Sequence, residues 1–344
     1  MKNVSFTFAI VILFFSASCE KNEKPEEKPN PPVENNAVFA KGADISWLTE
    51  MEHAGKKFYT TAGKETDCII LLRSLGMDAI RLRVWVNPVD GWCNKEDMLV
   101  KAIRAHNLGM RLMINFHYSD WWADPGQQTK PATWKDLPLE ELKSALANHT
   151  REVLNLLKSK DITPEWVQVG NETGNGMLWE DGKASVNMKN YVQLNNAGYD
   201  AVKTVFPDAK VIVHLQGGND NNLYRWLFDG LKNNGGKWDV IGMSLYPSKT
   251  TWSLMNTECI ANINDMIKRY NTEVMICEVG MPWDEATACK AFLTDLITKA
   301  KAVENKKCLG IFYWEPQSHA RWNGYTLGAF DSEGRPTEAM DAFN

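Results

Sequence analysis

From Val38 onward the chain repeats one pattern, in which a short apolar run is followed by a longer amphipathic stretch. The apolar runs lie at residues 39–46, 77–85, 110–117, 165–172, 209–216, 238–246, 274–278 and 308–314. The stretches between them have helical spacing, as at 139–160 and 257–270, and the last one, at 337–343, is short. Eight strand–helix units without a break in composition predict an α/β fold, a single closed (β/α)8 TIM barrel over residues 38–344.

Alternation within the apolar runs predicts which side chains point into the barrel. In the second run, Arg81, Arg83 and Trp85 share the face opposite to the apolar residues. The same alternation places further polar or aromatic side chains inward, near the C-terminal ends of their strands: Asp44, His117, Glu172, His214, Tyr246, Glu278 and Trp314. Barrel interiors are normally filled with apolar side chains, and active sites form at the rim where the strands end. The convergence therefore predicts a functional site there, although His214 could be only a hydrogen-bonded barrel residue.

Two of these residues are glutamates that end the fourth and seventh predicted strands. Glu172 follows Asn171, and Glu278 ends an apolar run in the second half of the chain. Cleavage of a glycosidic bond needs two carboxyl groups, one as an acid and one as a nucleophile or base, with pKa values held apart. One glutamate alone could equally be the buried ion-pair partner of Arg81 or Arg83. The pair, with aromatic residues nearby, favours a hydrolase.

Six stretches of the chain form long and specific motifs: GADISWLTEMEHAG, IRLRVWVNP, NFHYSDWWADPGQQTKPATW, QVGNETGNGMLW, ICEVGMPW and GIFYWEP. Together they resemble glycoside hydrolase family 53, the endo-β-1,4-galactanases. The resemblance implies a retaining double displacement, with Glu172 as the acid/base and Glu278 as the nucleophile. It also implies endo-hydrolysis of β-1,4-galactosidic bonds in galactan, the type I arabinogalactan of pectin side chains.

The other rim residues then acquire hypothetical roles. Asn171 could bind the sugar 2-hydroxyl, Tyr246 could hold the nucleophile, and Trp314 could stack on the sugar at the cleavage point. Either Arg81 or Arg83 could keep Glu278 ionised through its positive charge. The segment of Trp121 and Trp122 could contact sugar or could simply pack its own loop. The predicted substrate-binding set is Asp44, Arg81, Arg83, Trp85, His117, Asp120, Trp121, Asn171, His214, Tyr246 and Trp314.

The sequence predicts no metal and no cofactor. Bacterial members of the family that the chain resembles can carry a calcium-binding loop after the seventh strand. Here the segment is MPWDEATACKAF (281–292), which lacks alternating oxygen ligands and leads directly into a predicted helix. The polar segment GGNDNN (217–222) is more simply a strand–helix loop. Cys277 and Cys289 could pair in an exported protein or could both be buried thiols.

The N-terminus predicts export. Lys2 and an apolar run precede SASC, which resembles a lipoprotein cleavage box, so residues 1–18 are expected to be a signal peptide and Cys19 the lipidated residue. A plain secretory signal is the alternative. Residues 19–37 are charged and proline-rich and are expected to be a flexible tether. The early acidic residues resemble the surface-export signal of bacterial lipoproteins, and this resemblance implies the outer face of an outer membrane, with the lipid as the only membrane attachment.

Charge and composition limit the partners. The net charge of −5 offers no attraction toward nucleic acid, and no nucleotide-binding glycine motif occurs. The 14 tryptophans suit a groove that stacks on sugar rings. A polysaccharide-degrading monomer is expected. Two alternatives stay open: a related barrel hydrolase acting on mannan, xylan or β-glucan, and a surface lipoprotein that binds glycan without cutting it.

Overall fold

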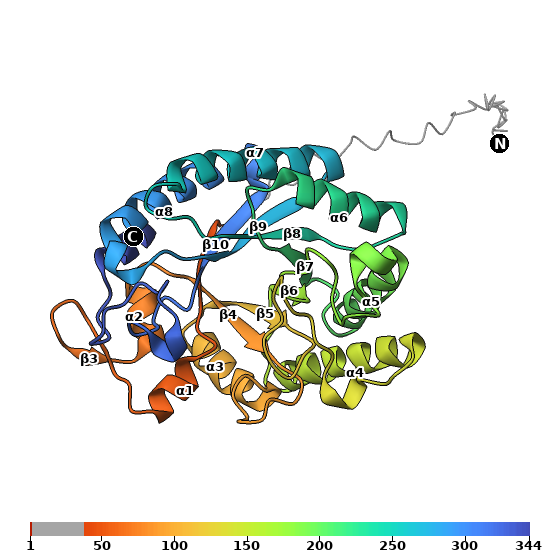
Figure 1. The fold of residues 1–344 in the computed structure, drawn as a ribbon, viewed down its shortest axis with the longest axis horizontal. Coiled ribbons are helices and arrows are strands. Elements are labelled where there is room, and N and C mark those ends of the chain that lie inside the picture. Colours follow the sequence, from red (N-terminus) through yellow and green to blue (C-terminus); the bar gives the residue numbers. More distant parts are fainter. Residues whose placement is uncertain (2–37) are drawn as a thin grey trace. The chain divides into compact units, whose positions relative to one another are not determined.

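The computed structural model describes residues 38–344 together with Met1. The predicted signal peptide (1–18), the lipidated Cys19 and the tether (19–37) lie outside the described residues and stay predictions. Within the described part, eight parallel strands close into a barrel, which confirms the predicted fold (Figure 1). The barrel strands are β1 (Ala40–Asp44), β4 (Ala79–Val84), β5 (Arg111–Phe116), β6 (Trp166–Val169), β7 (Lys210–Leu215), β8 (Val240–Leu245), β9 (Glu273–Val279) and β10 (Cys308–Trp314).

Closure joins the first barrel strand to the last. Residues 40–44 of β1 pair in register with residues 310–314 of β10, and β1 pairs on its other side with β4. Such a parallel register brings the C-terminal ends of all eight strands to one rim. Side chains that end distant strands in the sequence therefore meet at the mouth of one barrel.

Helices surround the barrel in chain order, as Figure 1 shows. They are α1 (Leu48–His53), α2 (Cys68–Ser74), α3 (Lys95–Asn107), α4 (Leu139–Lys158), α5 (Ala184–Val205), α6 (Asn221–Asn233), α7 (Trp252–Tyr270) and α8 (Ala286–Lys301). Asp220, in the polar segment 217–222, accepts a hydrogen bond from the backbone N–H of Leu223 and so caps α6, as expected of a strand–helix loop. The chain ends in the short 3-10 helix η5 (Glu338–Phe343) instead of a full α-helix.

The sequence pattern did not predict several small elements. A two-stranded hairpin, β2 (Phe58–Tyr59) with β3 (Glu65–Thr66), lies between α1 and α2. Short 3-10 helices occur at Ala132–Trp134, Trp283–Glu285, Glu304–Lys306 and Trp322–Gly324. All are too short to produce a readable period of hydrophobic residues. Cys277 and Cys289 do not pair, because all six described cysteines are buried free thiols.

Apolar and polar side chains divide the barrel interior into two zones. The N-terminal half holds a closed apolar cluster: Ala40, Ala79, Met113, Trp166, Ile212, Val240, Met275, Cys277, Leu309 and Phe312. Toward the C-terminal ends the inward side chains become polar and are still fully buried, as at Arg81, Gln168 and His214. Packing in the apolar zone stabilises the barrel. In the polar zone above it, each buried charge must be paired with another side chain inside the barrel, because water does not reach it.

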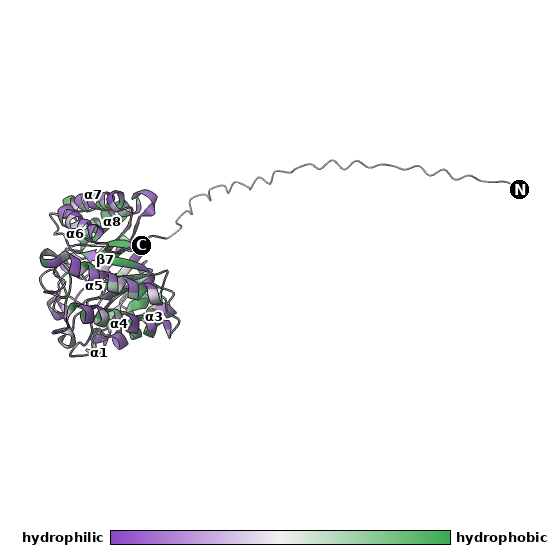
Figure 2. Cartoon of the chain, turned by 90° about the vertical axis from the view of Figure 1, so that its right-hand side faces the viewer, coloured by the Kyte–Doolittle hydropathy of each residue, from purple (hydrophilic) through white to green (hydrophobic). Residues whose placement is uncertain are grey.

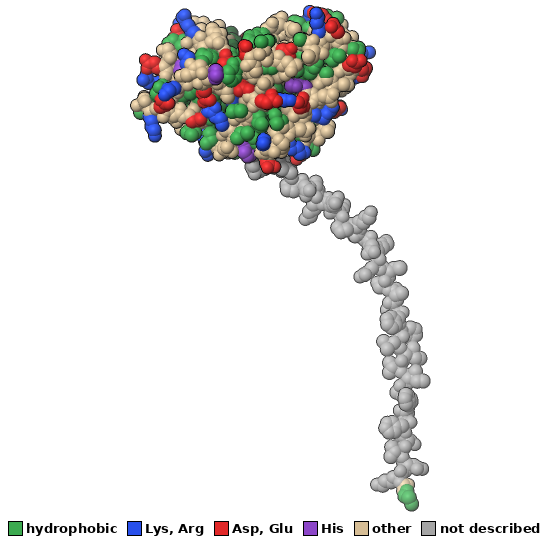
Figure 3. All heavy atoms as spheres, turned by 90° about the horizontal axis from the view of Figure 1, so that it is seen from below, with side chains coloured by type: hydrophobic (Ala, Val, Ile, Leu, Met, Phe, Trp, Pro, Cys, Tyr) green, Lys and Arg blue, Asp and Glu red, His purple; other side chains and the backbone are tan. Residues whose placement is uncertain are grey.

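Hydrophilic and charged side chains occur on the outer helices (Figure 2, Figure 3). In Figure 2 the strands are largely hydrophobic, whereas the surrounding helices carry hydrophilic residues as well. Figure 3 shows Lys and Arg interspersed with Asp and Glu on the face that it presents. Among the helices of residues 38–344, none has the length and apolar character needed to cross a membrane.

Gly42 of β1 provides a test of the barrel packing. A Cβ atom added at Gly42 would lie 2.2 Å from the ring of Phe312, which is fully buried. We expect Gly42→Ala to lower the free energy of unfolding by about 1–3 kcal/mol, because the core is already filled. Chemical denaturation measures this change. The double variant Gly42→Ala/Phe312→Leu should recover part of the loss, and an equal loss in both variants would contradict the packing explanation.

Candidate active site

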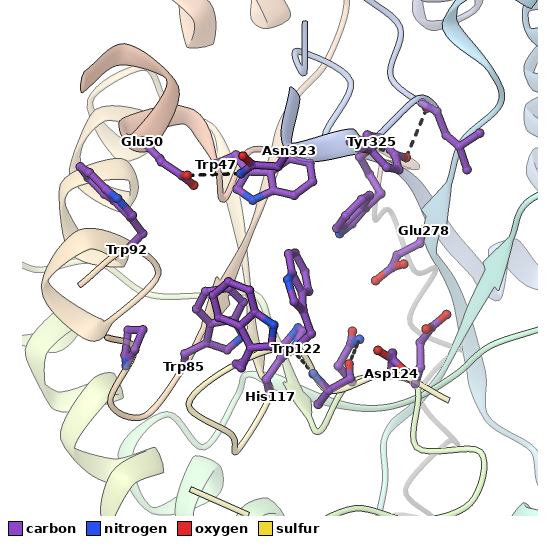
Figure 4. A pocket seen from close by; sticks show the side chains of 18 of the residues that line it. Trp47, Glu50, Trp85, Trp92, His117, Trp122, Asp124, Glu278, Asn323 and Tyr325 are labelled. Carbon is purple, nitrogen blue, oxygen red and sulfur yellow. Dashed lines mark hydrogen bonds between the residues drawn. The ribbon is translucent and has the colours of Figure 1, made fainter. Parts of the chain in front are cut away.

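A cleft of about 790 Å3 opens at the C-terminal rim of the barrel. Eight of the predicted site residues line it: Trp85, His117, Trp121, Asn171, Glu172, Tyr246, Glu278 and Trp314. They come from six strands or the loops that follow them. The predicted convergence at the rim therefore corresponds to one continuous cavity, part of which is drawn in Figure 4.

Glu278 lies near the end of β9 and is held by two side chains. Its Oε1 forms an ion pair with the Arg81 guanidinium at 2.8 Å, and its Oε2 accepts a hydrogen bond from the Tyr246 hydroxyl at 2.8 Å. Arg81 also pairs with Asp44 at 2.8 Å and donates to Gln168 at 2.6 Å. Of the two candidate arginines, Arg81 is therefore the one that contacts Glu278. The carboxylate is fixed in orientation at both oxygens.

Glu172 is presented by a turn beyond the end of β6. The strand ends at Val169, and both Gly170 (φ 87°) and Glu172 (φ 45°) have left-handed backbone conformations. At Gly170 a Cβ atom would come within 2.5 Å of Thr173, so only glycine fits there. For Glu172 the left-handed conformation costs about 1–2 kcal/mol, which the surrounding contacts must offset. This turn carries the Glu172 side chain into the cleft.

The two glutamates have different electrostatic surroundings. Burial raises the pKa of Glu172 to about 8, and the negative charge of Glu278 adds to the effect. Burial also raises the pKa of Glu278, but Arg81 and Tyr246 oppose this by stabilising its ionised form. The proton shared by such a pair is therefore placed on Glu172, while Glu278 is the anion.

Asn171 is clamped beside this pair. Its Oδ1 accepts hydrogen bonds from Arg81 at 3.1 Å and from Asn115 at 3.0 Å, and its Nδ2 donates to the backbone oxygen of Ala123 at 2.8 Å. An amide nitrogen has two hydrogens, so one remains for a ligand in the cleft. The Asn171 side chain is thus held by three hydrogen bonds, and one Nδ2 hydrogen is still free to donate.

Arg83 supports an aromatic wall instead of a glutamate of the pair. It is fully buried, and its guanidinium lies 4.2 Å from the ring of Trp122, 4.9 Å from Trp85 and 5.7 Å from Trp47. Its ion-pair partner is Glu315, at 3.4 Å. Cation–π contacts are stronger when they are shielded from water. The buried Arg83 therefore stabilises the orientation of these three indole rings from the side that faces away from the cleft.

Trp121 and Trp122 play separate parts in this wall. Trp122 packs edge-on against Trp47, Trp85 and Trp314 and is half-buried. Trp121 stacks on Trp85 with ring centroids 5.0 Å apart and is 57% exposed. Trp122 therefore packs the loop, whereas Trp121 leaves an indole face exposed at the cleft. Contact of Trp121 with sugar stays a prediction.

His117 also lines the cleft. Its Nδ1 accepts a hydrogen bond from the backbone N–H of Ala123 at 3.1 Å, which places the ring proton on Nε2. Burial lowers the pKa of His117 well below its ordinary value, and the charges of Arg83 and Arg81 add to this. His117 is thus a neutral hydrogen-bond donor.

Five predicted residues do not line the cleft: Arg81 and Arg83, described above, and Asp44, His214 and Asp120. Asp44 is fully buried and binds Arg81 and Ser46, and His214 is fully buried behind Glu172. Asp120 uses both carboxylate oxygens to accept backbone N–H groups of Asn87 and Ala132. Alternation predicts whether a side chain points into the barrel, but it does not predict whether that side chain reaches the cleft or stays buried beneath it. It therefore grouped buried residues with residues that line the cleft.

Several lining residues were not predicted: Trp47, Glu50, Trp92, Asp124, Asn323 and Tyr325 (Figure 4). Most lie in loops, where the two-residue period no longer applies. The side-chain amide of Asn323 donates a hydrogen bond to the Glu50 carboxylate at 3.2 Å, although the two residues are far apart in the chain. Trp47, Glu50 and Asp124 lie within stretches that resemble the family, and this is the only signal in the sequence that points to them. Among the described residues, no group of three or more His, Cys, Asp or Glu side chains has a metal-binding arrangement.

The barrel, with a buried Glu278 and a half-buried Glu172 in one indole-lined cleft, defines the chain as a (β/α)8-barrel glycoside hydrolase. Residues 40–343 match the family described as Glycosyl hydrolase family 53. The chain belongs to this family.

The chain is also similar to individual proteins along most of its length. An uncharacterised protein of Niallia circulans is 32% identical over 89% of this chain and 93% of its own length. An arabinogalactan endo-beta-1,4-galactanase of Cellvibrio japonicus is 33% identical, over 83% of this chain and 82% of its own. A solved structure described as one of two fungal beta-1,4-galactanases superimposes with a TM-score of 0.82 at 28% identity, covering 89% of this chain and 99% of that one.

The raised pKa of Glu172 predicts a pH-dependent stability effect. A carboxyl whose pKa is raised on folding favours the folded state below its unfolded pKa, and this contribution is lost as pH rises through about 8. Glutamine cannot ionise, so Glu172→Gln should gain stability relative to the parent between about pH 5 and pH 9. Thermal melts across this range measure the difference, with the exposed Glu141→Gln on α4 as control. A difference in Tm that is constant with pH would contradict the assignment.

Proposed function

We propose that the protein is an endo-β-1,4-galactanase that cleaves galactan of the pectin type by double displacement with retention of configuration. The observation that supports it most directly is the pairing of Glu172 and Glu278 in one cleft, with only Glu278 held by a cation and a phenol. Family membership and the galactanases among its relatives support the substrate.

In the first step, Glu278 attacks the anomeric carbon while Glu172 gives its proton to the departing oxygen. The ion pair with Arg81 keeps Glu278 ionised before attack, and the Tyr246 hydroxyl directs one of its oxygens. Glu172 is suited to the acid role because its raised pKa leaves it protonated near neutral pH. This geometry expects a carboxyl separation of about 5–5.5 Å.

In the second step, Glu172 has become a carboxylate and removes a proton from water, which attacks the glycosyl–Glu278 ester. The free Nδ2 hydrogen of Asn171 is placed to bind the sugar 2-hydroxyl as charge develops. Trp314 offers a stacking surface at the cleavage point, and Trp121 offers a second one toward the lip of the cleft. The apolar faces of galactosyl rings would lie on these indoles.

Hydrolysis of linear β-1,4-galactan tests the function. We expect galacto-oligosaccharides of several lengths early in the reaction and a first-formed β-anomer by NMR, with mannan, xylan and β-glucan largely uncut. Glu278→Gln should lower kcat by more than about 1000-fold, since it removes the nucleophile, whereas Glu141→Gln should not. For Glu172→Gln, aryl galactosides with good leaving groups should still form the glycosyl-enzyme, and azide should restore turnover.

Three results would contradict this function. Binding of galactan without cleavage would favour the non-catalytic alternative. Preferred cleavage of another polysaccharide would favour a different substrate. A first-formed α-anomer would exclude retention.

We also propose that the protein is an outer-membrane lipoprotein exposed at the cell surface. The proposal is supported only by the sequence, in which Cys19 follows a signal-like segment. We expect Cys19→Ala to move the enzyme from the membrane fraction to a soluble fraction with unchanged specific activity. Metabolic labelling with a fatty acid and protease treatment of intact cells measure lipidation and exposure. Labelling of the Cys19→Ala variant would show that the lipid is attached elsewhere.

A further inference from the structure

His214 and Ser244 form a buried hydrogen-bond chain behind Glu172. The backbone N–H of Glu172 donates to Nδ1 of His214 at 3.4 Å, and Nε2 of His214 lies 2.8 Å from the Ser244 hydroxyl. The Ser244 hydroxyl also faces the Glu172 carboxyl and lowers its pKa. The chain thus runs from the main chain of Glu172, through His214, to a hydroxyl beside the Glu172 side chain.

The protonation state of His214 sets the direction of the two hydrogen bonds that its ring makes. His214 is fully buried, and burial, with the charge of Arg81, lowers its pKa well below the ordinary value, so the ring is neutral. Because Nδ1 accepts the Glu172 amide, the single ring proton sits on Nε2 and is donated to Ser244. Ser244 already accepts from His214, which leaves its own O–H free to donate to another group.

We propose that Ser244, oriented by His214, is a positioning residue that donates a hydrogen bond to the Glu172 carboxyl and favours its ionised form. The proposal rests on the acid/base role proposed for Glu172. A hydrogen bond to a carboxylate is stronger than one to a neutral acid, so Ser244 acts mainly when Glu172 has lost its proton. That is the state needed to activate water in the second step.

The surroundings of Glu172 disfavour its ionised form, and a hydrogen-bond donor such as Ser244 opposes this effect. The groups that face it are Arg81 of β4, Asp124 after β5, His214 of β7, Ser244 of β8, Tyr246 after β8 and Glu278 of β9. Burial and the negative charges of Glu278 and Asp124 raise its pKa, whereas the Ser244 hydroxyl and Arg81 lower it. Arg81 is already engaged with Asp44 and Glu278, so Ser244 is the uncharged donor that counters the raise.

The pH dependence of Ser244→Ala tests this role. Because the acid form of Glu172 is active in kcat/KM, the alkaline limb should move upward by about one pH unit when the hydroxyl is removed. With an activated aryl galactoside, whose slow step needs ionised Glu172, the acid limb of kcat should also move upward. Ser244→Thr keeps the hydroxyl and should restore both limbs. A merely structural role would lower activity at every pH without moving either limb.

Thr272→Ala is the matched control. It removes a buried hydroxyl that donates to the backbone oxygen of Asp239 at 2.8 Å, next to the N-terminal end of β9 and away from the cleft. Neither limb should move in this variant. An unmoved alkaline limb in Ser244→Ala, with a Tm equal to the parent, would overturn the proposal.

A second measurement does not depend on turnover. In Glu278→Gln protein labelled with 13C at glutamate carboxyls, the Glu172 resonance, assigned by its loss in Glu172→Gln, should titrate about one pH unit higher when Ser244→Ala is added. An unchanged midpoint would overturn the role of Ser244. If the parent protein cuts no β-1,4-galactan, the proposed function fails instead, and this titration still tests the hydrogen bond.

Discussion

The ion pairs of Arg81 are the interaction on which the site depends. This guanidinium is fully buried between Asp44 and Glu278 and also binds Asn171. A buried charge is tolerated only when it is paired and hydrogen-bonded, so the cluster must form as a unit. One cation between two carboxylates leaves a net negative charge. A third ionised carboxyl nearby is therefore unfavourable, and Glu172 retains its proton.

The barrel makes this cluster possible by separating two kinds of packing. The lower interior is apolar and rigid, and it keeps the strands in register beneath the charged groups. Above it, each charged group has a partner from a neighbouring strand or loop. Arg83 likewise forms a buried ion pair, with Glu315. Its guanidinium also makes cation–π contacts with Trp47, Trp85 and Trp122. Charge pairing thus stabilises both the carboxyl pair and the aromatic wall.

Much of the site was predictable because strands impose a two-residue period. Arg81, Glu172, Tyr246 and Glu278 were all assigned to the interior near the rim, and they meet there. Asn171 precedes Glu172, so the period did not place it inward, and its role came only from the family resemblance. The same period could not distinguish Arg81 from Arg83 as the partner of Glu278, because both point inward from one strand. It also gave no information on loops, so Trp47, Trp92 and Tyr325 were missed. Asp120 was predicted to bind sugar, but its carboxylate is occupied by two backbone N–H groups.

The sequence by itself determined the barrel, its eight strands and the two glutamates, because these follow from local periodicity and from residue type at strand ends. Tertiary structure decided which group keeps a proton, which arginine serves which carboxyl, and which indole is exposed. Those properties depend on distances between side chains far apart in the chain. Electrostatic energy and desolvation vary with such distances, and no local pattern records them.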